Sequence, residues 1–279
     1  MDITGIRDDG YHLISTVMQR LEFYDEITVD FEEKQQNNLE IVLTTNKSFL
    51  PTNEKNIAYK AALLIGEMTD KKGVVTIDII KHIPVAAGLA GGSGNGAAVL
   101  IALNKLMEIN MSIRDLSKLA AKLGADVPFM VLTQATKYTL SLGENLGDDL
   151  TPYKFGLGKH VVIAKPAFGV STKDAYIGMD QISIEKHPDA KEVIGHLKSR
   201  DYSGLYHSMG NVLELYTLKE YPEVERLKRT MSSISDCEFT LMSGSGPTVF
   251  SVYSTLNAAK AACIELRNMG YEAYWTKAL

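Results

Sequence analysis

A glycine-rich segment carries the residues of this chain that are best suited to binding a phosphate group. It runs from Pro84 to Ala98 and contains five glycines. Glycine has no Cβ, so its backbone can approach a ligand closely and adopt positive φ angles. Successive backbone N–H groups can then point at one anion, and a helix that begins here adds unpaired N–H groups and a favourable dipole. Ser93 adds a hydroxyl that could contact a phosphate oxygen or its Mg²⁺. The segment therefore predicts a phosphate site.

Three other interpretations of this segment are weaker. A purely structural turn would not need five glycines between a strand and a buried helix. A P-loop requires a lysine in the pattern GxxxxGK[ST], and this loop has no lysine. A dinucleotide-binding fingerprint can be matched loosely through Gly92, Gly94 and Ala97, but it leaves Gly88 and Gly91 without a role.

The glycine-rich segment resembles the phosphate loop of the GHMP kinases. Motifs at residues 7–12, 56–62, 124–129 and 242–250 match one branch of this family in the same order and with similar spacing. The resemblance covers nearly the whole chain. It implies an α+β fold, with an N-terminal ribosomal-S5-like domain, a C-terminal ferredoxin-like domain and an active site between them.

The same resemblance implies a reaction and its partners. ATP would phosphorylate the C2 hydroxyl of a methylerythritol unit that carries a cytidine diphosphate, in non-mevalonate isoprenoid precursor synthesis. The cofactors would be ATP and Mg²⁺, with Ser93 as a metal ligand. The expected ATP-binding residues are Pro84, Val85, Ala86, Ala87, Gly88, Leu89, Ala90, Gly91, Gly92, Ser93 and Gly94.

Five residues outside the phosphate segment take roles by the resemblance. Asp126 would orient or deprotonate the acceptor hydroxyl, although an aspartate that follows a helix is otherwise most often a turn residue. Tyr11 and His12 would hold the cytidine group by stacking and by a specific hydrogen bond. Gly244 and Ser245 would bind substrate, and their alternative is a tight hairpin turn between two strands.

The chain departs from the family pattern at two places. The family begins with a strand that carries Lys-x-Asn, and its lysine lies beside the catalytic aspartate. This chain starts after that strand, and its first lysine is Lys34. We therefore expect a downstream start or a truncated chain. The family also has two consecutive serines in the phosphate loop, whereas Ser93 is followed in this chain by Gly94.

Hydrophobic periodicity predicts the elements that position these residues. Alternation predicts strands near residues 27–31, 39–43 and 75–79, with a polar turn over residues 35–38. Helices are expected over residues 57–68, 97–107 and 112–123, the last with a capping box at Ser112 and Asp115. The second half predicts strands near 160–164, 239–242, 248–253 and 271–275, helices over 174–231, and another helix near 258–267. We expect domains at residues 1–150 and 151–279.

Composition is that of a globular protein without nucleic-acid or membrane partners. Hydrophobic residues make up 45% of the 279 residues, and the formal net charge is −5. No apolar run reaches the length that crosses a bilayer, so a cytoplasmic enzyme acting on a small molecule is expected. The alternatives are a GHMP kinase for another small alcohol, a nucleotide-binding paralogue without turnover, and, more distantly, a dinucleotide-dependent oxidoreductase.

Overall fold

The computed structural model describes residues 1–35 and 38–279. These residues form two compact units. The first unit contains residues 1–23, 85–89 and 139–279, and the second contains residues 24–84 and 90–138. The turn predicted over residues 35–38 includes residues 36 and 37, which lie outside the described residues.

The second unit is built on a three-stranded sheet. Its strands are β3 (Glu26–Glu33), β4 (Leu39–Thr45) and β5 (Gly73–Ile80), in the order β3-β5-β4. Strand β5 pairs antiparallel with β3 and parallel with β4. Val75, Ile77 and Ile79 on β5 are fully buried, as expected when alternate side chains point to one face of a sheet. This alternation confirms the three predicted strands.

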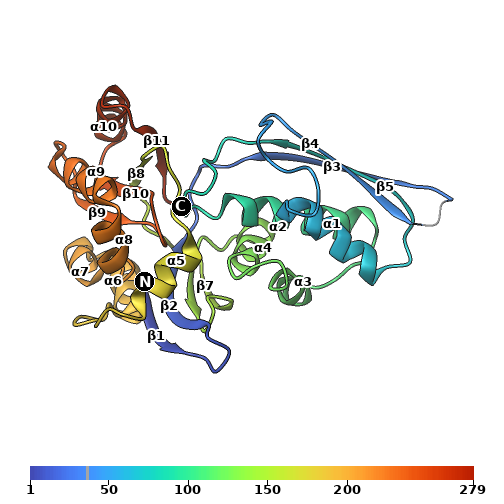
Figure 1. The fold of residues 1–279 in the computed structure, drawn as a ribbon, viewed down its shortest axis with the longest axis horizontal. Coiled ribbons are helices and arrows are strands. Elements are labelled where there is room, and N and C mark those ends of the chain that lie inside the picture. Colours follow the sequence, from blue (N-terminus) through green and yellow to red (C-terminus); the bar gives the residue numbers. More distant parts are fainter. Residues whose placement is uncertain (36–37) are drawn as a thin grey trace. The chain divides into compact units, whose positions relative to one another are not determined.

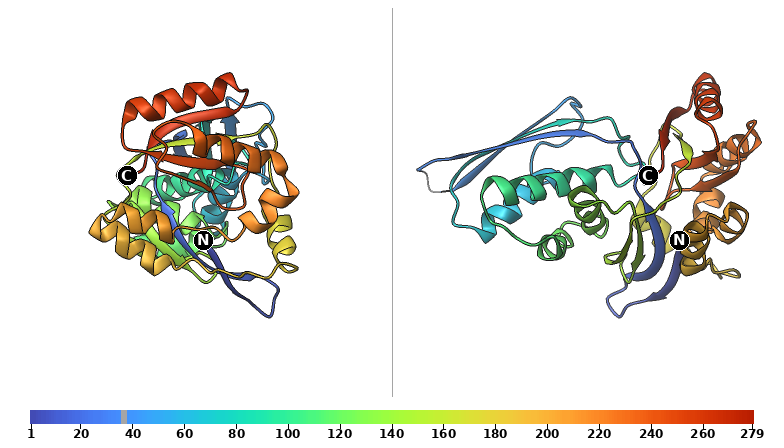
Figure 2. Two further views of the ribbon diagram at one scale, coloured as in Figure 1. Left: turned by 90° about the vertical axis from the view of Figure 1, so that its left-hand side faces the viewer. Right: turned by 180° about the vertical axis from the view of Figure 1, so that it is seen from behind.

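Four helices lie on one side of this sheet, with α1 and α2 next to the strands and α3 and α4 packed against helices (Figures 1 and 2). They are α1 (Ile57–Met68), α2 (Gly91–Leu106), α3 (Ile113–Ala120) and α4 (Val127–Ala135). The side chain of Ser112 accepts a hydrogen bond from the backbone N–H of Asp115, which confirms the predicted cap of α3. Periodicity did not predict α4, a short helix that is apolar on most sides.

The start of α2 corrects one expectation. The sequence predicted a glycine loop that ends at Gly96, with a helix from residue 97, but the helix begins at Gly91. The glycines allow close packing here: a Cβ at Gly96 would lie 2.6 Å from Cγ2 of Ile57, on α1. Glycine is therefore needed at this position for the contact between two helices, and the loop that precedes the helix is shorter than predicted.

The first unit contains two antiparallel sheets. One has the order β1-β2-β6-β7, and the other has the order β11-β8-β10-β9. The strands of the first sheet are β1 (Asp2–Ile6), β2 (His12–Gln19), β6 (Leu140–Glu144) and β7 (Asp149–Tyr153). Those of the second are β8 (His160–Lys165), β9 (Phe239–Met242), β10 (Val249–Tyr253) and β11 (Glu272–Lys277). The sequence predicted all four strands of the second sheet and none of the first.

Helices α9 (Pro222–Ser233) and α10 (Leu256–Asn268) pack on one face of the second sheet, around Val162 and Val249. The core around Ile163 includes residues of α6 (Ala190–Ser199) and α7 (Tyr202–Ser208), and α6 packs against β2 and β6 of the first sheet. The remaining helices of this unit are α5 (Thr172–Met179) and α8 (Glu214–Glu220). Together with the second unit, this architecture confirms the predicted α+β class.

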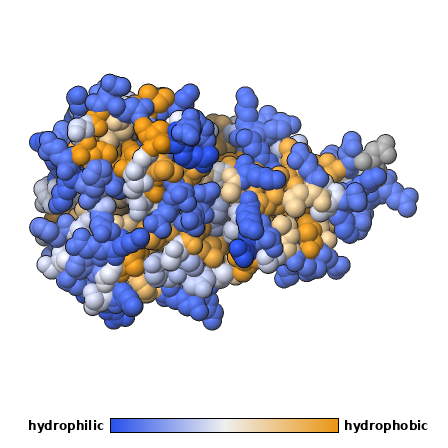
Figure 3. Space-filling model, turned by 90° about the horizontal axis from the view of Figure 1, so that it is seen from below, coloured by the Kyte–Doolittle hydropathy of each residue, from blue (hydrophilic) through white to orange (hydrophobic). Residues whose placement is uncertain are grey.

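The face of the molecule drawn in Figure 3 is mainly polar. Hydrophilic residues cover most of the face drawn in Figure 3, and hydrophobic residues show through in smaller patches. Among the described residues, no helix combines the length and hydrophobicity needed to cross a membrane.

Candidate active site

The first turn of α2 has the groups that a phosphate requires. The backbone N–H groups at the start of a helix have no acceptor within the helix, and here they belong to Gly91, Gly92 and Ser93. Among the described residues, the hydroxyl of Ser93 has no hydrogen-bond partner, and the residue is half-buried. The preceding residue, Ala90, is in the left-handed conformation with φ of 50° and has no capping side chain. The turn is therefore open to an anionic ligand.

The predicted ATP-binding segment is divided between the two units. Residues 85–89 belong to the first unit, whereas Pro84 and residues 90–94 belong to the second. In the first unit, Gly88 has φ of 67°, and a Cβ there would lie 2.8 Å from the carbonyl oxygen of Ser243. The hydroxyl of Ser243 donates to the carbonyl oxygen of Gly88 at 2.9 Å. Only glycine fits this close approach of two backbones.

A buried ion pair lies beneath the start of α2. The Nζ atom of Lys81 lies 2.5 Å from Oδ2 of Asp25, and both side chains are almost fully buried. Burial lowers the pKa of Lys81, and the hydrogen bond to Asp25 partly opposes this effect. With its amide nitrogen turned toward them, Asn95 donates to the carbonyl oxygen of Gly91 at 2.9 Å and to Asp25 at 2.8 Å. The pair therefore fixes the first turn of α2 to the end of β5.

Asp126 is the N-cap residue of α4 rather than a residue that simply follows a helix. An N-cap aspartate usually accepts a hydrogen bond from its own helix, but the Asp126 side chain makes no capping bond. Within the described part of the chain it has no hydrogen bond or ion pair. Although the residue as a whole is exposed, the protein atoms around the carboxyl group desolvate it and raise its pKa above the usual value. Asp126 is thus an unpartnered carboxylate suited to accepting a proton.

Helix α4 packs against α2. The side-chain amide of Gln134 donates to the carbonyl oxygen of Gly94 at 3.0 Å. A Cβ at Gly94 would lie 3.9 Å from the sulfur of Met130, which is one turn after Asp126. The helix that begins at Asp126 is therefore held directly against the turn that carries Ser93.

Tyr11 and His12 lie where a hairpin turn leads into β2. Tyr11 is 64% exposed, so its ring is available for stacking. Nε2 of His12 lies 2.8 Å from Oδ1 of Asp180, and the His12 ring packs against Tyr176 with centroids 5.1 Å apart. A neutral His12 that donates from Nε2 to the carboxylate keeps Nδ1 as an acceptor. The sequence did not predict Asp180 or Tyr176 as neighbours of this pair.

Gly244 and Ser245 lie in the loop between β9 and β10. The hydroxyls of Ser245 and Thr172 lie 3.0 Å apart, and Ser245 is only 6% exposed. The loop contains a cis peptide bond between Gly246 and Pro247. It joins two antiparallel strands, so the hairpin alternative describes its topology correctly.

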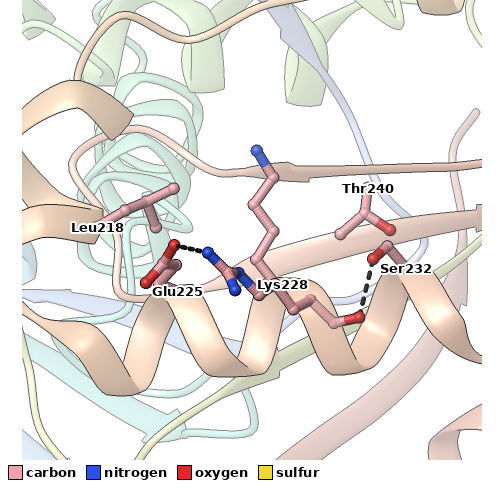
Figure 4. Close-up of a pocket in the computed structure, with 6 residues that line it drawn as sticks. Leu218, Glu225, Lys228, Ser232 and Thr240 are labelled. Atoms are coloured by element: carbon pink, nitrogen blue, oxygen red, sulfur yellow. Dashed lines mark hydrogen bonds and ion pairs between the residues drawn. The ribbon is translucent and has the colours of Figure 1, made fainter.

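One cavity of about 300 Å³ lies elsewhere, against α9 and β9 (Figure 4). Its charged side chains are paired: Arg229 with Glu225 at 2.5 Å, and Lys228 with Glu214 at 2.6 Å. None of the residues predicted from the sequence lines it. Its charges are neutralised within the protein, so it does not compete with the α2 turn as a phosphate site.

The sequence did not reveal the residues that support the site. Asp25 and Lys81 immediately flank the predicted strands β3 and β5, and charged residues at strand ends are common on surfaces. Only the tertiary structure shows that these two are buried together. Asn211 and Glu214 both contact the end of β9, and nothing in their spacing reveals these contacts.

Comparison with protein-family models gives two matches. The model of the GHMP kinases N terminal domain matches residues 56–134, and the model of the GHMP kinases C terminal domain matches residues 193–272. The first match includes the α2 turn and Asp126. Together the two matches span more than half of the chain.

Relatives and solved structures agree with these matches. A 4-diphosphocytidyl-2-C-methyl-D-erythritol kinase of Clostridium perfringens is 40% identical over 94% of this chain and 88% of that protein. The enzyme of the same name from Clostridium beijerinckii is 36% identical over 100% of this chain and 96% of that protein. A crystal structure of 4-(cytidine 5'-diphospho)-2C-methyl-D-erythritol kinase has a TM-score of 0.80 and 26% identity, and covers 100% of this chain and 95% of that one. A homoserine kinase from Cytophaga hutchinsonii, at 18% identity and a TM-score of 0.71 over 94% of this chain and 88% of that one, shares the fold.

Proposed function

Because the chain belongs to the GHMP kinase family, we propose that it transfers the γ-phosphate of ATP to the C2 hydroxyl of 4-diphosphocytidyl-2-C-methyl-D-erythritol. This reaction would serve isoprenoid precursor synthesis. One observation carries the proposal: the same unit contains an open helix N-terminus at Ser93 and an unpartnered carboxylate at Asp126. Phosphoryl transfer needs mainly these two things, namely a cradle for phosphate and a group that orients the acceptor. Domains at residues 1–150 and 151–279 remain part of the proposal, since the two family models fall on either side of residue 150. The compact units divide the chain elsewhere, because residues 1–23, 85–89 and 139–150 belong to the same unit as residues 151–279.

Asp126 is the proposed catalytic residue. Its carboxylate would accept the proton of the acceptor hydroxyl as that oxygen bonds to the γ-phosphorus and the bond from the phosphorus to the β,γ-bridging oxygen breaks. The raised pKa of Asp126 brings its basicity closer to the range in which a general base works well near neutral pH. The start of α4 stabilises the ionised form, which limits how far the pKa can rise.

The proposed ATP-binding segment is Pro84 to Gly94. The free N–H groups and the positive end of the α2 dipole would bind phosphate oxygens. The backbone turns that shape the segment depend on positive φ angles at Ala86, Gly88 and Ala90. The ion pair beneath the turn would keep its N–H groups aimed at the ligand without reorganisation.

Mg²⁺ fits this site as an ion carried largely by the nucleotide. No group of three or more His, Cys, Asp or Glu side chains suited to a metal occurs in the described part of the chain. Mg²⁺ commonly takes only one or two protein ligands, with phosphate oxygens and water completing an octahedron. The unpartnered hydroxyl of Ser93 would be its protein ligand. Bound there, the ion would offset negative charge on the transferring phosphate.

Tyr11, His12, Gly244 and Ser245 are the proposed acceptor-binding residues. The exposed ring of Tyr11 offers a stacking surface for a pyrimidine. In the neutral tautomer that donates from Nε2 to Asp180, His12 would offer Nδ1 as an acceptor for the exocyclic amine of cytosine. The hydroxyl and backbone of Ser245 would contact the polar part of the acceptor.

A panel of acceptors tests the proposal. Purified protein and MgATP are mixed with 4-diphosphocytidyl-2-C-methyl-D-erythritol, 2-C-methyl-D-erythritol 4-phosphate, homoserine or mevalonate, and ADP release is measured by a coupled assay. We expect kcat/KM to be at least about 100-fold higher for the cytidine-bearing acceptor, since its base interactions contribute binding energy. A preference for another alcohol would assign a different GHMP kinase reaction. ATP binding without turnover of any acceptor would indicate the nucleotide-binding paralogue.

A further inference from the structure

Three polar side chains, spaced three residues apart, hold the loop that contains Gly244 and Ser245. They are Asn211, Glu214 and Thr217, which lie in the turn before α8 and in α8 itself. We call them the anchor stripe. Their hydrogen bonds go to backbone groups of residues 242–245, and the members and their targets all belong to the first unit.

Asn211 uses every polar atom of its side chain. Its Nδ2 donates to the carbonyl oxygens of Met242 at 3.0 Å and Gly244 at 2.8 Å, and its Oδ1 accepts from the backbone N–H of Leu213 at 3.1 Å. The residue is 7% exposed. One amide thus bridges the end of β9 and the loop, and it is itself held in orientation by the backbone of its own turn.

Glu214 binds the same strand end as an acceptor, whereas Asn211 binds it as a donor. Its Oε1 accepts from the backbone N–H of Met242 at 2.9 Å, while its Oε2 pairs with Lys228 on α9 at 2.6 Å. The ion pair leaves no net charge uncompensated at this position. Both polar backbone groups of Met242 are therefore bound by members of the anchor stripe.

Thr217 reaches the centre of the loop. Its hydroxyl donates to the carbonyl oxygen of Ser245 at 3.2 Å, and the residue is fully buried. Its methyl group also limits the space beside Gly246, where a Cβ would lie 3.2 Å from Cγ2 of Thr217. Thr217 therefore restrains the backbone at Ser245 through its hydroxyl and limits the space beside Gly246 through its methyl group.

The hydrogen bonds from the anchor stripe are additional to those that the hairpin loop makes within itself. The loop already has its own internal hydrogen bonds, from the N–H of Ser243 to Thr248 at 2.9 Å and from the N–H of Gly246 to Ser243 at 3.0 Å. Loops that only connect strands are commonly exposed and mobile, whereas this one is buried and bound from α8. Its hydroxyl at Ser243 in turn binds the carbonyl oxygen of Gly88 in the proposed ATP-binding segment.

We propose that the anchor stripe, with Thr217 as its central member, positions the backbone of Gly244 and Ser245 for acceptor binding. This inference rests on the proposed function, because it assigns the loop to the acceptor. The three residues would act on the acceptor only through the loop backbone that they bind, so they are positioning residues. A precisely held loop matters because small displacements of binding groups weaken both binding and turnover.

Paired threonine substitutions test the inference. Thr217→Val removes the hydroxyl and keeps the shape, whereas Thr217→Ser keeps the hydroxyl. The matched control is Thr276→Val in β11, because Thr276 is similarly buried and its hydroxyl has no hydrogen bond within the described residues. For each variant, KM for the acceptor, KM for ATP and kcat are measured, together with hydrogen–deuterium exchange of peptides that cover residues 240–250.

We expect Thr217→Val to raise KM for the acceptor about fivefold, the effect of one lost hydrogen bond, with KM for ATP within about twofold of wild type. Exchange over residues 240–250 should become faster in this variant alone, and Thr217→Ser should restore both readings. Equal exchange and equal acceptor KM in all three variants would overturn the inference. If the wild-type protein turns over no cytidine-bearing acceptor, the proposed function fails. In that case, hydrogen–deuterium exchange over residues 240–250 still tests whether Thr217 anchors the loop. The same exchange in Thr217→Val and wild type would overturn the inference as well.

Discussion

Replacing Gly96 with alanine should destabilise the protein, whereas the same change at Gly94 should stabilise it. Both glycines lie in the first two turns of α2, and neither has a positive φ angle. In solution peptides the two changes would be nearly equivalent, because alanine favours a helix over glycine by up to about 1 kcal/mol. The structure predicts that packing separates them.

The distances set the magnitudes. At Gly94, a Cβ would lie 3.7 Å from Nε2 of Gln134 and 3.9 Å from the sulfur of Met130, which are ordinary contacts. We expect a gain of about 0.5 kcal/mol in the free energy of unfolding, because the position is near the helix end. At Gly96, a Cβ would lie 2.6 Å from Cγ2 of Ile57 and 3.4 Å from its carbonyl oxygen. Overpacking of this kind costs about 1–3 kcal/mol, which exceeds the propensity gain.

Differential scanning calorimetry of the two variants and the wild type measures the effect. For a chain of this size, about 1 kcal/mol corresponds to a change in Tm of roughly 2 °C. We expect the Tm of Gly96→Ala to fall by about 2–4 °C and that of Gly94→Ala to rise slightly. The matched control is an Ile57→Ala background, which lacks the contacting Cγ2 atom, so Gly96→Ala should lower the Tm less there. If Gly96→Ala is as stable as Gly94→Ala, the close packing of α1 on α2 is refuted.

Three further predictions concern the site. Ser93→Ala should raise KM for MgATP about tenfold and leave KM for the acceptor within about twofold, since the lost group binds only the nucleotide and its ion; equal effects on both values would argue against this role. Because the folded pKa of Asp126 is raised, kcat should fall as the pH drops through a value above 3.8, where the carboxylate takes up a proton, and a profile that stays flat to about pH 4 in a folded enzyme would contradict this. The same raised pKa affects stability. Between pH 3.8 and the folded pKa of Asp126, the folded state binds more protons than the unfolded state. The contribution of Asp126 to the free energy of unfolding therefore decreases as the pH rises through this range. Asp25→Asn should leave the buried ammonium of Lys81 without its partner and lower the free energy of unfolding by about 3–5 kcal/mol, as measured by chemical denaturation; a loss below about 1 kcal/mol would show that the pair is dispensable.

Periodicity predicted the elements whose pattern is set by one buried face. The strands β3, β4 and β5 alternate clearly, and the side-chain cap of α3 was predicted from the sequence. The strands β1, β2, β6 and β7 escaped prediction. In β6 the first four residues are all buried, so the period of two is lost there. Helix α4 was missed for the same reason, because five of its nine residues are buried and a helix that is apolar on most sides shows no stripe.

The glycine-rich segment shows the limits of composition. Its glycines favour a loop by propensity, yet four of them lie in α2. At two of these, Gly91 and Gly96, close packing against Lys81 and Ile57 leaves no room for a side chain. Tertiary packing outweighs intrinsic propensity at such places. The sequence therefore predicted the character of the segment, but it placed the helix start at residue 97 instead of Gly91.

The candidate residues divide in a similar way. Residues whose role depends on their own chemistry, such as Ser93 and Asp126, could be proposed from type and motif. Residues that act through others, such as Asn211 and Thr217, could not, because their partners are backbone groups far away in the sequence. No pattern in one chain shows which distant carbonyl oxygen a buried amide will bind.

The most direct test of the central claim compares wild type with Asp126→Asn, which keeps the shape of the side chain and removes its basicity. Calorimetric titration gives the Kd for MgATP and for 4-diphosphocytidyl-2-C-methyl-D-erythritol, and a single-turnover assay gives the rate of phosphoryl transfer. We predict that both Kd values stay within about threefold while the transfer rate falls at least about 100-fold, as expected for loss of a general base. A transfer rate within about tenfold of wild type, with binding intact, would contradict the assignment of Asp126 as the catalytic residue.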